Sequence, residues 1–246
     1  MNKKSIKSLS VDIGTVAVGV GVTTLTDPLG ALVAGVFGPR LNDILKRKLS
    51  VLEQSRITRV YEQSLGLMKK KIDSGLKVSE TKTKDDMKIL LEGSLLAARD
   101  SYEDKKIPLL ANLLSNAPFT NTPTENLVEV LKLTESYSYR KLCIISVVGK
   151  NLALSPISFK EKYKRKPTTE TILGVYFDVL SLIRGGIFVQ LENDNEHLNP
   201  VNYIADIITD RLNLYTLGRV LFVSLQLDSL DKENPEFKKV FQILKQ

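Results

Sequence analysis

Apolar residues recur at helical spacing through the first half of the chain, and between 41 and 72 they fall on one face of a helix. Pro39 stands just before this stretch, where proline is tolerated at a helix start, and Asp73-Ser74-Gly75 supplies a turn and a capping glycine after it. The pattern predicts one long amphipathic helix. Its apolar face consists of Leu41, Ile44, Leu45, Leu49, Leu52, Ile57, Val60, Leu65, Met68 and Ile72.

The helical pattern continues to residue 149 with interruptions. A polar linker at 77–86 precedes a helix from Met87 to roughly Tyr102, and Pro108 forces a kink or a break in its continuation. The run Thr122-Pro123-Thr124-Glu125 is typical of a helix cap and leads into a helical stretch at 126–149.

After residue 151 the pattern alternates between helix and strand. The predicted elements are a helix at 168–183 ended by Gly185-Gly186, extended pieces at 187–194 and 212–216, and helices at 217–227 and 235–245. This order is that of a winged-helix unit, a fold that often binds DNA. The helix at 168–183 exposes mainly Thr168, Glu170, Asp178 and Ser181, with Arg184 near its end, so a protein-interaction or structural winged helix is favoured over a DNA reader.

Residues 13–38 form an apolar, glycine-rich segment with basic flanks. They contain one charge, Asp27, and six of the fourteen glycines. A secretory leader is disfavoured because Asp12 precedes the apolar run and no clear cleavage site follows. A single membrane-spanning helix is disfavoured because Asp27-Pro28 divides the segment into pieces too short for a bilayer core of ~30 Å.

Two interpretations of this segment stay open. Small residues recur at four-residue spacing, for example Ala17 with Gly21 and Ala31 with Gly35. Such spacing lets helices approach closely, so a hairpin around Thr26-Asp27-Pro28 could pack inside the protein or a homo-oligomer, or insert into a membrane on activation. The segment could equally be a core helix and loop. We expect a mainly α fold with an apolar membrane-directed segment at 1–40, a helical domain at 41–150 and a winged-helix-like domain at 151–246.

The charge of the chain restricts its partners. A formal net charge of +7 and a pI near 9.3 favour nucleic acid or an anionic membrane surface. A run of basic residues is most often a solvated face, but these residues are also the candidates for contact with anionic lipid headgroups. The candidate lipid-binding residues are Lys46, Arg47, Lys48, Arg56, Arg59, Lys69, Lys70, Lys71, Lys160, Lys162, Lys164, Arg165 and Lys166.

Candidate catalytic chemistry is sparse. Cys143 is the only cysteine and His197 the only histidine, so a disulfide framework and a structural zinc site of cysteines and histidines are excluded by count. Cys143 lies in an apolar run and is expected to be buried and inert. The adjacent acids Glu103-Asp104 are expected to point in different directions rather than form a catalytic pair. We therefore predict no enzyme activity, cofactor or metal.

Three pieces of the chain together resemble uncharacterised helical proteins encoded in bacterial defence loci. They are DPLGALVAGVFGPRLNDILKRKL at 27–49, LLEGSLLAARDSYEDKKIPLLANLLSNA at 90–117, and the C-terminal piece LYTLGRVLF at 214–222. The chain is also similar to the membrane-acting effectors that accompany short prokaryotic Argonautes. The resemblance implies a protein that damages the inner membrane when an immune sensor is triggered.

The resulting hypothesis is a non-enzymatic antiviral effector of abortive infection that binds anionic phospholipids and disrupts the inner membrane. It would be cytoplasmic at rest, would respond to a sensor protein of the same defence system such as a short Argonaute complex, and could form a homo-oligomer. The alternatives are a winged-helix nucleic-acid-binding regulator, and a scaffold or partner subunit of a defence complex.

Overall fold

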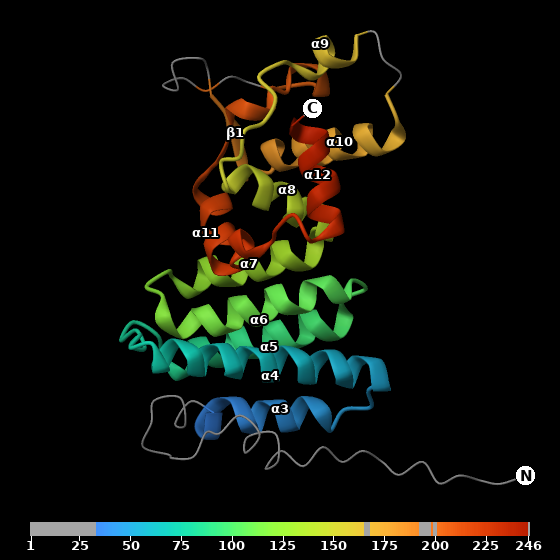
Figure 1. Cartoon of the computed structure of the whole chain (residues 1–246). Helices are drawn as coiled ribbons and strands as arrows, with labels where there is room; N and C mark the ends of the chain where they lie inside the picture. The colour runs from blue at the N-terminus through green and yellow to red at the C-terminus, as the bar shows by residue number, and fades with distance from the viewer. Residues whose placement is uncertain (1–32, 165–167, 192–197, 199–200, 246) are drawn as a thin grey trace, which may run out of the picture.

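The computed structural model describes residues 33–164, 168–191, 198 and 201–245. This part of the chain is mainly helical, as predicted, with ten α-helices and one two-stranded antiparallel sheet (Figure 1). The helices are α3 (Gly38–Leu45), α4 (Val51–Asp73), α5 (Lys84–Asp100), α6 (Ile107–Asn116), α7 (Thr124–Ser136), α8 (Tyr139–Gly149), α9 (Phe159–Tyr163), α10 (Glu170–Arg184), α11 (Thr216–Ser224) and α12 (Pro235–Lys245). The strands are β1 (Phe188–Gln190) and β2 (Leu212–Leu214).

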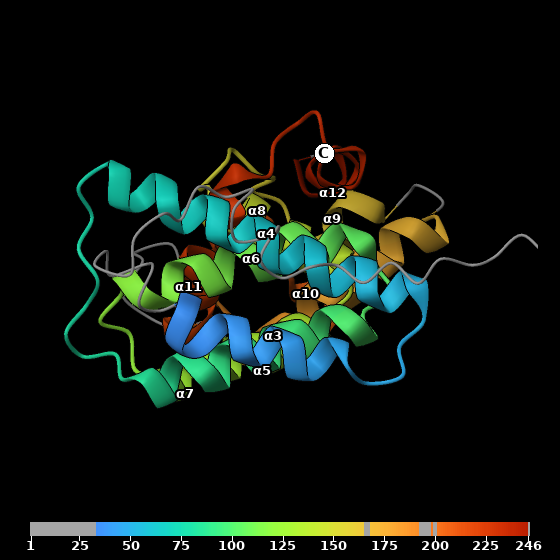
Figure 2. The same ribbon diagram turned by 90° about the horizontal axis from the view of Figure 1, so that it is seen from below.

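The helices are stacked in layers. In Figure 1, α3 lies at one end, α4 to α7 follow, and α8 is surrounded by the C-terminal elements, with α9 at the opposite end. Figure 2, seen from the α3 end, shows α3 lying over α5, and the two helices are in contact. Helix α4 packs on both α5 and α6. Neighbours in the stack are therefore not always neighbours in the chain, since α3 contacts α5 and α4 contacts α6.

The predicted single helix at 41–72 is wrong: the structure contains two helices, α3 and α4, separated by residues 46–50. The cause is Ser50, whose hydroxyl accepts a hydrogen bond from the Glu53 amide at 3.3 Å while the Glu53 carboxylate accepts one from the Ser50 amide at 2.7 Å. This reciprocal capping box satisfies amides that a new helix start leaves unpaired. The chain therefore turns before Val51 and begins a helix with a new register.

The end of α4 is as predicted. Gly75 has φ +89°, a left-handed conformation that glycine adopts without steric cost. Its amide donates to the Ile72 carbonyl at 2.8 Å, and the Leu76 amide donates to the Lys71 carbonyl at 3.0 Å. These two bonds form a Schellman motif, which fixes the direction of the chain as it leaves the helix.

The helical stretch at 126–149 is also divided, contrary to the prediction. Helix α7 ends at Ser136, and α8 begins after Ser138, whose hydroxyl accepts from the Lys141 amide at 3.3 Å. The start of α7 is near the predicted cap, but Pro123 occupies the cap position and no side-chain cap bond forms. Pro108 lies in the first turn of α6, so the expected interruption is a full break between helices.

Helix α8 lies at the centre of the C-terminal half. All but a few of its residues are buried, which is the pattern of a helix enclosed on every side. Cys143 on this helix is fully buried, as predicted, and burial raises the pKa of its thiol to about 12. Helices α10, α11 and α12 all contact α8, so the proposed domains on either side of residue 150 are packed against each other.

The C-terminal elements occur in the predicted order, α10, β1, β2, α11 and α12. Strands β1 and β2 pair antiparallel, with Phe188 opposite Leu214. Helix α11 approaches the chain before β1 so closely that a Cβ atom at Gly218 would lie 2.3 Å from the Ile187 carbonyl oxygen. Only glycine fits at this position without a shift of the backbone.

Most of the apolar segment at 13–38 lies outside the described residues, as do His197, Arg165 and Lys166. Its last part is described: Val36 and Phe37 are buried, and the turn that contains them packs against α5. For these residues the interpretation as part of the core holds. Among the described helices, none combines the length and apolar character that a membrane crossing requires.

Candidate functional site

The candidate lipid-binding residues occupy separate parts of the structure. Lys46, Arg47 and Lys48 lie in the turn before α4, and Lys69, Lys70 and Lys71 lie near its end. Helix α4, with 23 residues at ~1.5 Å per residue, is about 34 Å long, so the two groups lie near its opposite ends. The residues of α9 lie at the opposite end of the molecule from α3 (Figure 1). The structure therefore divides one basic set into groups with different surroundings.

The first group belongs to an exposed corner, residues 46–52, which we call the α3–α4 corner. Lys46 and Lys48 are exposed, and Arg47 reaches Glu92 at 3.8 Å, too long for a strong ion pair. Beside them, Val51 is 86% exposed and Leu52 54% exposed. The corner thus combines solvated cations with two apolar side chains that are more than half exposed.

The exposure of Leu52 corrects its expected place on the buried helical face. Because Ser50 restarts the helix, the buried stripe of α4 begins at Ile57 and continues through Val60, Tyr61 and Leu65. Val51 and Leu52 occupy the first turn outside this stripe. Sequence reasoning missed Val51, although the spacing Ser50-x-x-Glu53 is a recognisable signal for a helix start.

Arg56 and Arg59, in the middle of α4, bind a carboxylate of the protein itself. The distance from Arg56 Nε to Asp104 Oδ1 is 2.7 Å, and Arg59 lies 3.4 Å from the other carboxylate oxygen. The hydrogen bond from Arg56 lowers the pKa of Asp104. These arginines hold α4 to the turn between α5 and α6, an interaction that competes with any role as lipid ligands.

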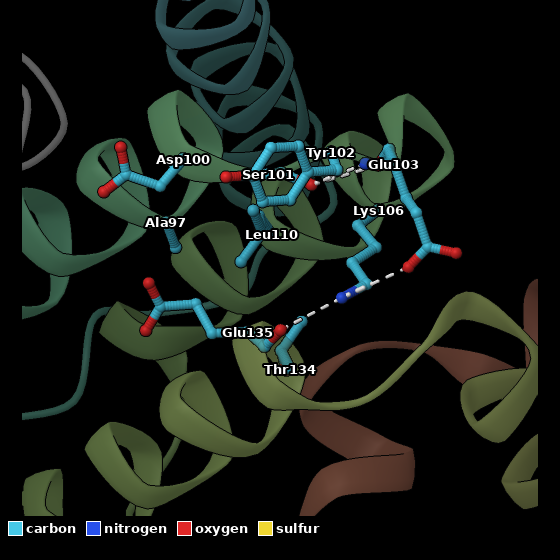
Figure 3. A pocket seen from close by; sticks show the side chains of 9 residues that line it. All are labelled: Ala97, Asp100, Ser101, Tyr102, Glu103, Lys106, Leu110, Thr134 and Glu135. Carbon is cyan, nitrogen blue, oxygen red and sulfur yellow. Dashed lines mark hydrogen bonds and ion pairs between the residues drawn. The ribbon is translucent and has the colours of Figure 1, made fainter.

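The same turn lines a small pocket of about 190 Å³ (Figure 3). The buried Lys106 points between two helices, and its Nζ donates to the Glu135 carbonyl at 3.1 Å and lies 3.4 Å from Glu103 Oε2. Glu103 in turn accepts hydrogen bonds from the Tyr139 amide at the start of α8. Glu103 and Asp104 therefore point to different partners, as predicted, and the pocket is a structural junction of four helices.

The described residues show no candidate metal site, either in this junction or elsewhere. No group of three or more histidine, cysteine, aspartate or glutamate side chains is arranged to hold an ion there.

At the end of α4, Lys70 is exposed but its neighbour Lys71 is half-buried. Lys71 Nζ donates to Ser115 Oγ at 3.0 Å and to Asn116 Oδ1, and lies 5.8 Å from the centre of the Phe119 ring. Burial lowers the pKa of Lys71 to about 8. Lys71 is therefore directed into the protein, where it lines a groove between α4 and α11.

The lysines in and next to helix α9 likewise include exposed side chains and one that is held by the protein. Lys160 and Lys164 are exposed, whereas Lys162 donates to the Tyr176 hydroxyl at 3.2 Å and to the Ile243 carbonyl at 3.2 Å. Burial lowers the pKa of Lys162. Lys162 thus ties α9 to α10 and α12, while only its neighbours face solvent.

Comparisons with known proteins give no information about function, so the proposal below rests on the geometry. No family model matches the chain, and neither the curated proteins nor the solved structures contain a significant match to it.

Proposed function

We propose that the protein is a non-enzymatic effector that binds anionic phospholipid membranes through the α3–α4 corner. The observation that carries this proposal is the juxtaposition of exposed Lys46 and Lys48 with exposed Val51 and Leu52. Cations attract the anionic headgroups, and apolar side chains next to them can enter the interface below the headgroups.

Neither the electrostatic attraction nor the apolar contact is sufficient alone for stable membrane binding. Each lysine or arginine near an anionic surface contributes ~1 kcal/mol, and this attraction decreases within a Debye length. Two apolar side chains give a further, short-range contribution that depends on contact. Stable peripheral binding generally combines two such signals, and the corner places both within seven residues, 46 to 52.

The position of the corner also relates it to the apolar segment at 13–38. Helix α3 has 8 residues, so the corner lies only about 12 Å along the helix from the end of that segment. A segment released from the protein at this end would meet the membrane that the corner binds. The resemblance to effectors of defence loci supports membrane disruption on activation by a partner sensor, with the protein in the cytoplasm at rest and at the inner membrane when active.

Vesicle flotation tests the proposal. The full-length protein is expected to float with vesicles containing phosphatidylglycerol or cardiolipin and to stay behind with phosphatidylcholine alone. K46E/K48E reverses two charges and should weaken binding by about 4 kcal/mol, or roughly a thousandfold. The matched control is K238E/K239E, which makes the same charge change at exposed positions of α12.

Equal flotation of the two double variants would contradict the assignment of the corner. Absence of flotation of the parent protein, with or without an activating partner, would contradict membrane binding itself. Dye leakage from the same vesicles separates surface binding from membrane disruption.

A second candidate is a nucleic-acid-binding regulator, favoured by the order α10, β1, β2 and α11 and by exposed Lys160 and Lys164. Against it, Asp178 of α10 forms a 2.6 Å ion pair with Arg140 of α8, so this helix is held against the body. DNA binding with a steep salt dependence that survives K46E/K48E would favour this candidate.

A further inference from the structure

A groove lies between the C-terminal end of α4, the connection from α6 to α7, and helix α11. Its volume is about 660 Å³, within the ~300–1,000 Å³ range of small-molecule sites. The apolar residues that line it are Leu76, Phe119, Val220, Phe222 and Val223. Leu76 is 50% exposed and Val223 68% exposed, so this groove presents apolar surface that a ligand could cover.

The polar side of the groove is a fixed hydrogen-bond network. Asn116 is at its centre: its Oδ1 accepts from Lys71 Nζ and from Gln226 Nε2, and its Nδ2 donates to the Ser224 carbonyl at 2.9 Å. The network joins α4, α6 and α11, which are distant in sequence. It holds the ammonium group of Lys71 at one position beside the apolar wall.

Within the part of the chain that the structure describes, Lys71 forms no ion pair. Both acceptors of its ammonium group, Ser115 and Asn116, are neutral, and no carboxylate lies within 4.0 Å of it among the described residues. Two other charged residues line the groove, Arg219 and Asp228, so the lining carries a net positive charge. A half-buried cation without a counter-ion is a site where an anion gains free energy by binding.

We infer that this α4–α11 groove binds a single-chain amphiphile with an anionic head. The acyl chain lies along Phe119, Phe222 and Val223, and the head lies at Lys71. This occupant is favoured because the groove offers both an apolar wall and an unbalanced cation. A neutral chain would leave the charge unpaired, and a small anion would leave the wall uncovered. The site is separate from the α3–α4 corner and does not depend on membrane binding by that corner.

Displacement of a fluorescent fatty acid tests the inference. cis-Parinarate is titrated into the full-length protein below its micelle concentration and is then displaced by oleate or by lysophosphatidylglycerol. Displacement by either supports the site, and the stronger competitor shows whether the head is a carboxylate or a phosphate. Inorganic phosphate supplies an anion without a chain, and dodecyl maltoside a chain without a charge. Both are expected to compete poorly.

Two variants and two matched controls locate the site. K71M keeps the aliphatic stem but removes the charge and should weaken parinarate binding by about tenfold or more, whereas K70M changes an exposed neighbour and should have no effect. V223D places a carboxylate at an exposed groove position and should also weaken binding, whereas F177D makes a similar change on α10 and should not. Circular dichroism confirms that each variant is folded.

The inference is overturned if the parent protein does not bind parinarate, if phosphate displaces it as well as oleate does, or if V223D binds as tightly as F177D. K46E/K48E should retain parinarate binding, and V223D should retain vesicle flotation. The same set of proteins therefore distinguishes failure of the ligand-binding inference for the groove from failure of the membrane-binding proposal for the corner.

Discussion

The two ends of helix α4 are both basic, but their cations have different environments. At the N-terminal end, Lys46 and Lys48 are solvated and stand next to exposed Val51 and Leu52. At the C-terminal end, Lys71 is half-buried and bound to Ser115 and Asn116. The first environment is the basis of the proposed membrane contact, and the second is the basis of the proposed ligand site in the groove.

The difference shows that the number of cations in a segment does not indicate what the cations do. Lys70 and Lys71 lie in the last turn of α4, where the helix dipole favours positive charge in any case. Arg56 and Arg59 neutralise Asp104 and hold α4 to a neighbouring turn. Exposed cations occur at several places, among them Lys70 and Lys160, but at the interruption made by Ser50 they stand beside exposed Val51 and Leu52.

Among changes that leave the charge of the corner intact, the largest effect is expected from one that tests whether its apolar part contributes. V51S/L52S removes both exposed apolar side chains and should weaken binding to phosphatidylglycerol vesicles by about 2 kcal/mol, or roughly thirtyfold. F177S, which removes an exposed aromatic side chain from α10, is the control. Binding is measured by flotation across a series of lipid concentrations. If V51S/L52S and the control bind equally, the corner acts through charge alone.

Much of the fold follows from sequence signals that act locally. Pro39, Gly75 and Pro108 mark helix ends because each restricts or frees the backbone of its own residue. Ser50 and Ser138 were missed because apolar periodicity continues on both sides of each serine, so the pattern resembles an unbroken helix. For Ser50, the glutamate three positions later was the available signal.

The groove could not be predicted in this way. Lys70 and Lys71 are adjacent in the sequence, yet Lys70 is exposed and Lys71 half-buried, because side chains one residue apart point about 100° apart around a helix. Which of them meets Ser115 and Asn116 depends on how α4 packs on α6. No local pattern contains that information. The same is true of Arg56 and Arg59, whose partner Asp104 is more than forty residues away in the sequence.

A smaller effect is expected from the serine that creates the corner. S50A removes the side-chain acceptor of the Glu53 amide and should lower the free energy of unfolding by about 1 kcal/mol in urea denaturation. S50D restores an N-cap of similar strength but adds a negative charge to the corner. It should therefore be as stable as the parent protein and yet bind anionic vesicles more weakly. Weaker vesicle binding by S50A than by S50D would contradict an electrostatic role for the corner.

The smallest expected effect concerns how Lys71, at the C-terminal end of α4, makes the free energy of unfolding depend on pH. Lys71 has a folded-state pKa of about 8, below the ordinary value of 10.5. Between these values the unfolded chain binds more protons at this residue, so its contribution to the free energy of unfolding increases as the pH rises. The increase should be about 1 kcal/mol or less, because part of the side chain remains in contact with water.

The measurement compares thermal unfolding of the parent protein and K71M at pH 7.5, 8.5 and 9.5. Because K71M cannot titrate at this position, the stability of the parent relative to K71M should increase over this range. Arg219 and Asp228, the other charged residues of the groove, are present in both proteins, so their effects cancel in the difference. Oleate should reduce the change, since an anion bound at Lys71 favours the protonated amine. If the stability difference between the parent protein and K71M stays constant with pH, Lys71 is already well solvated. The two ends of α4 would then not differ in the burial of charge.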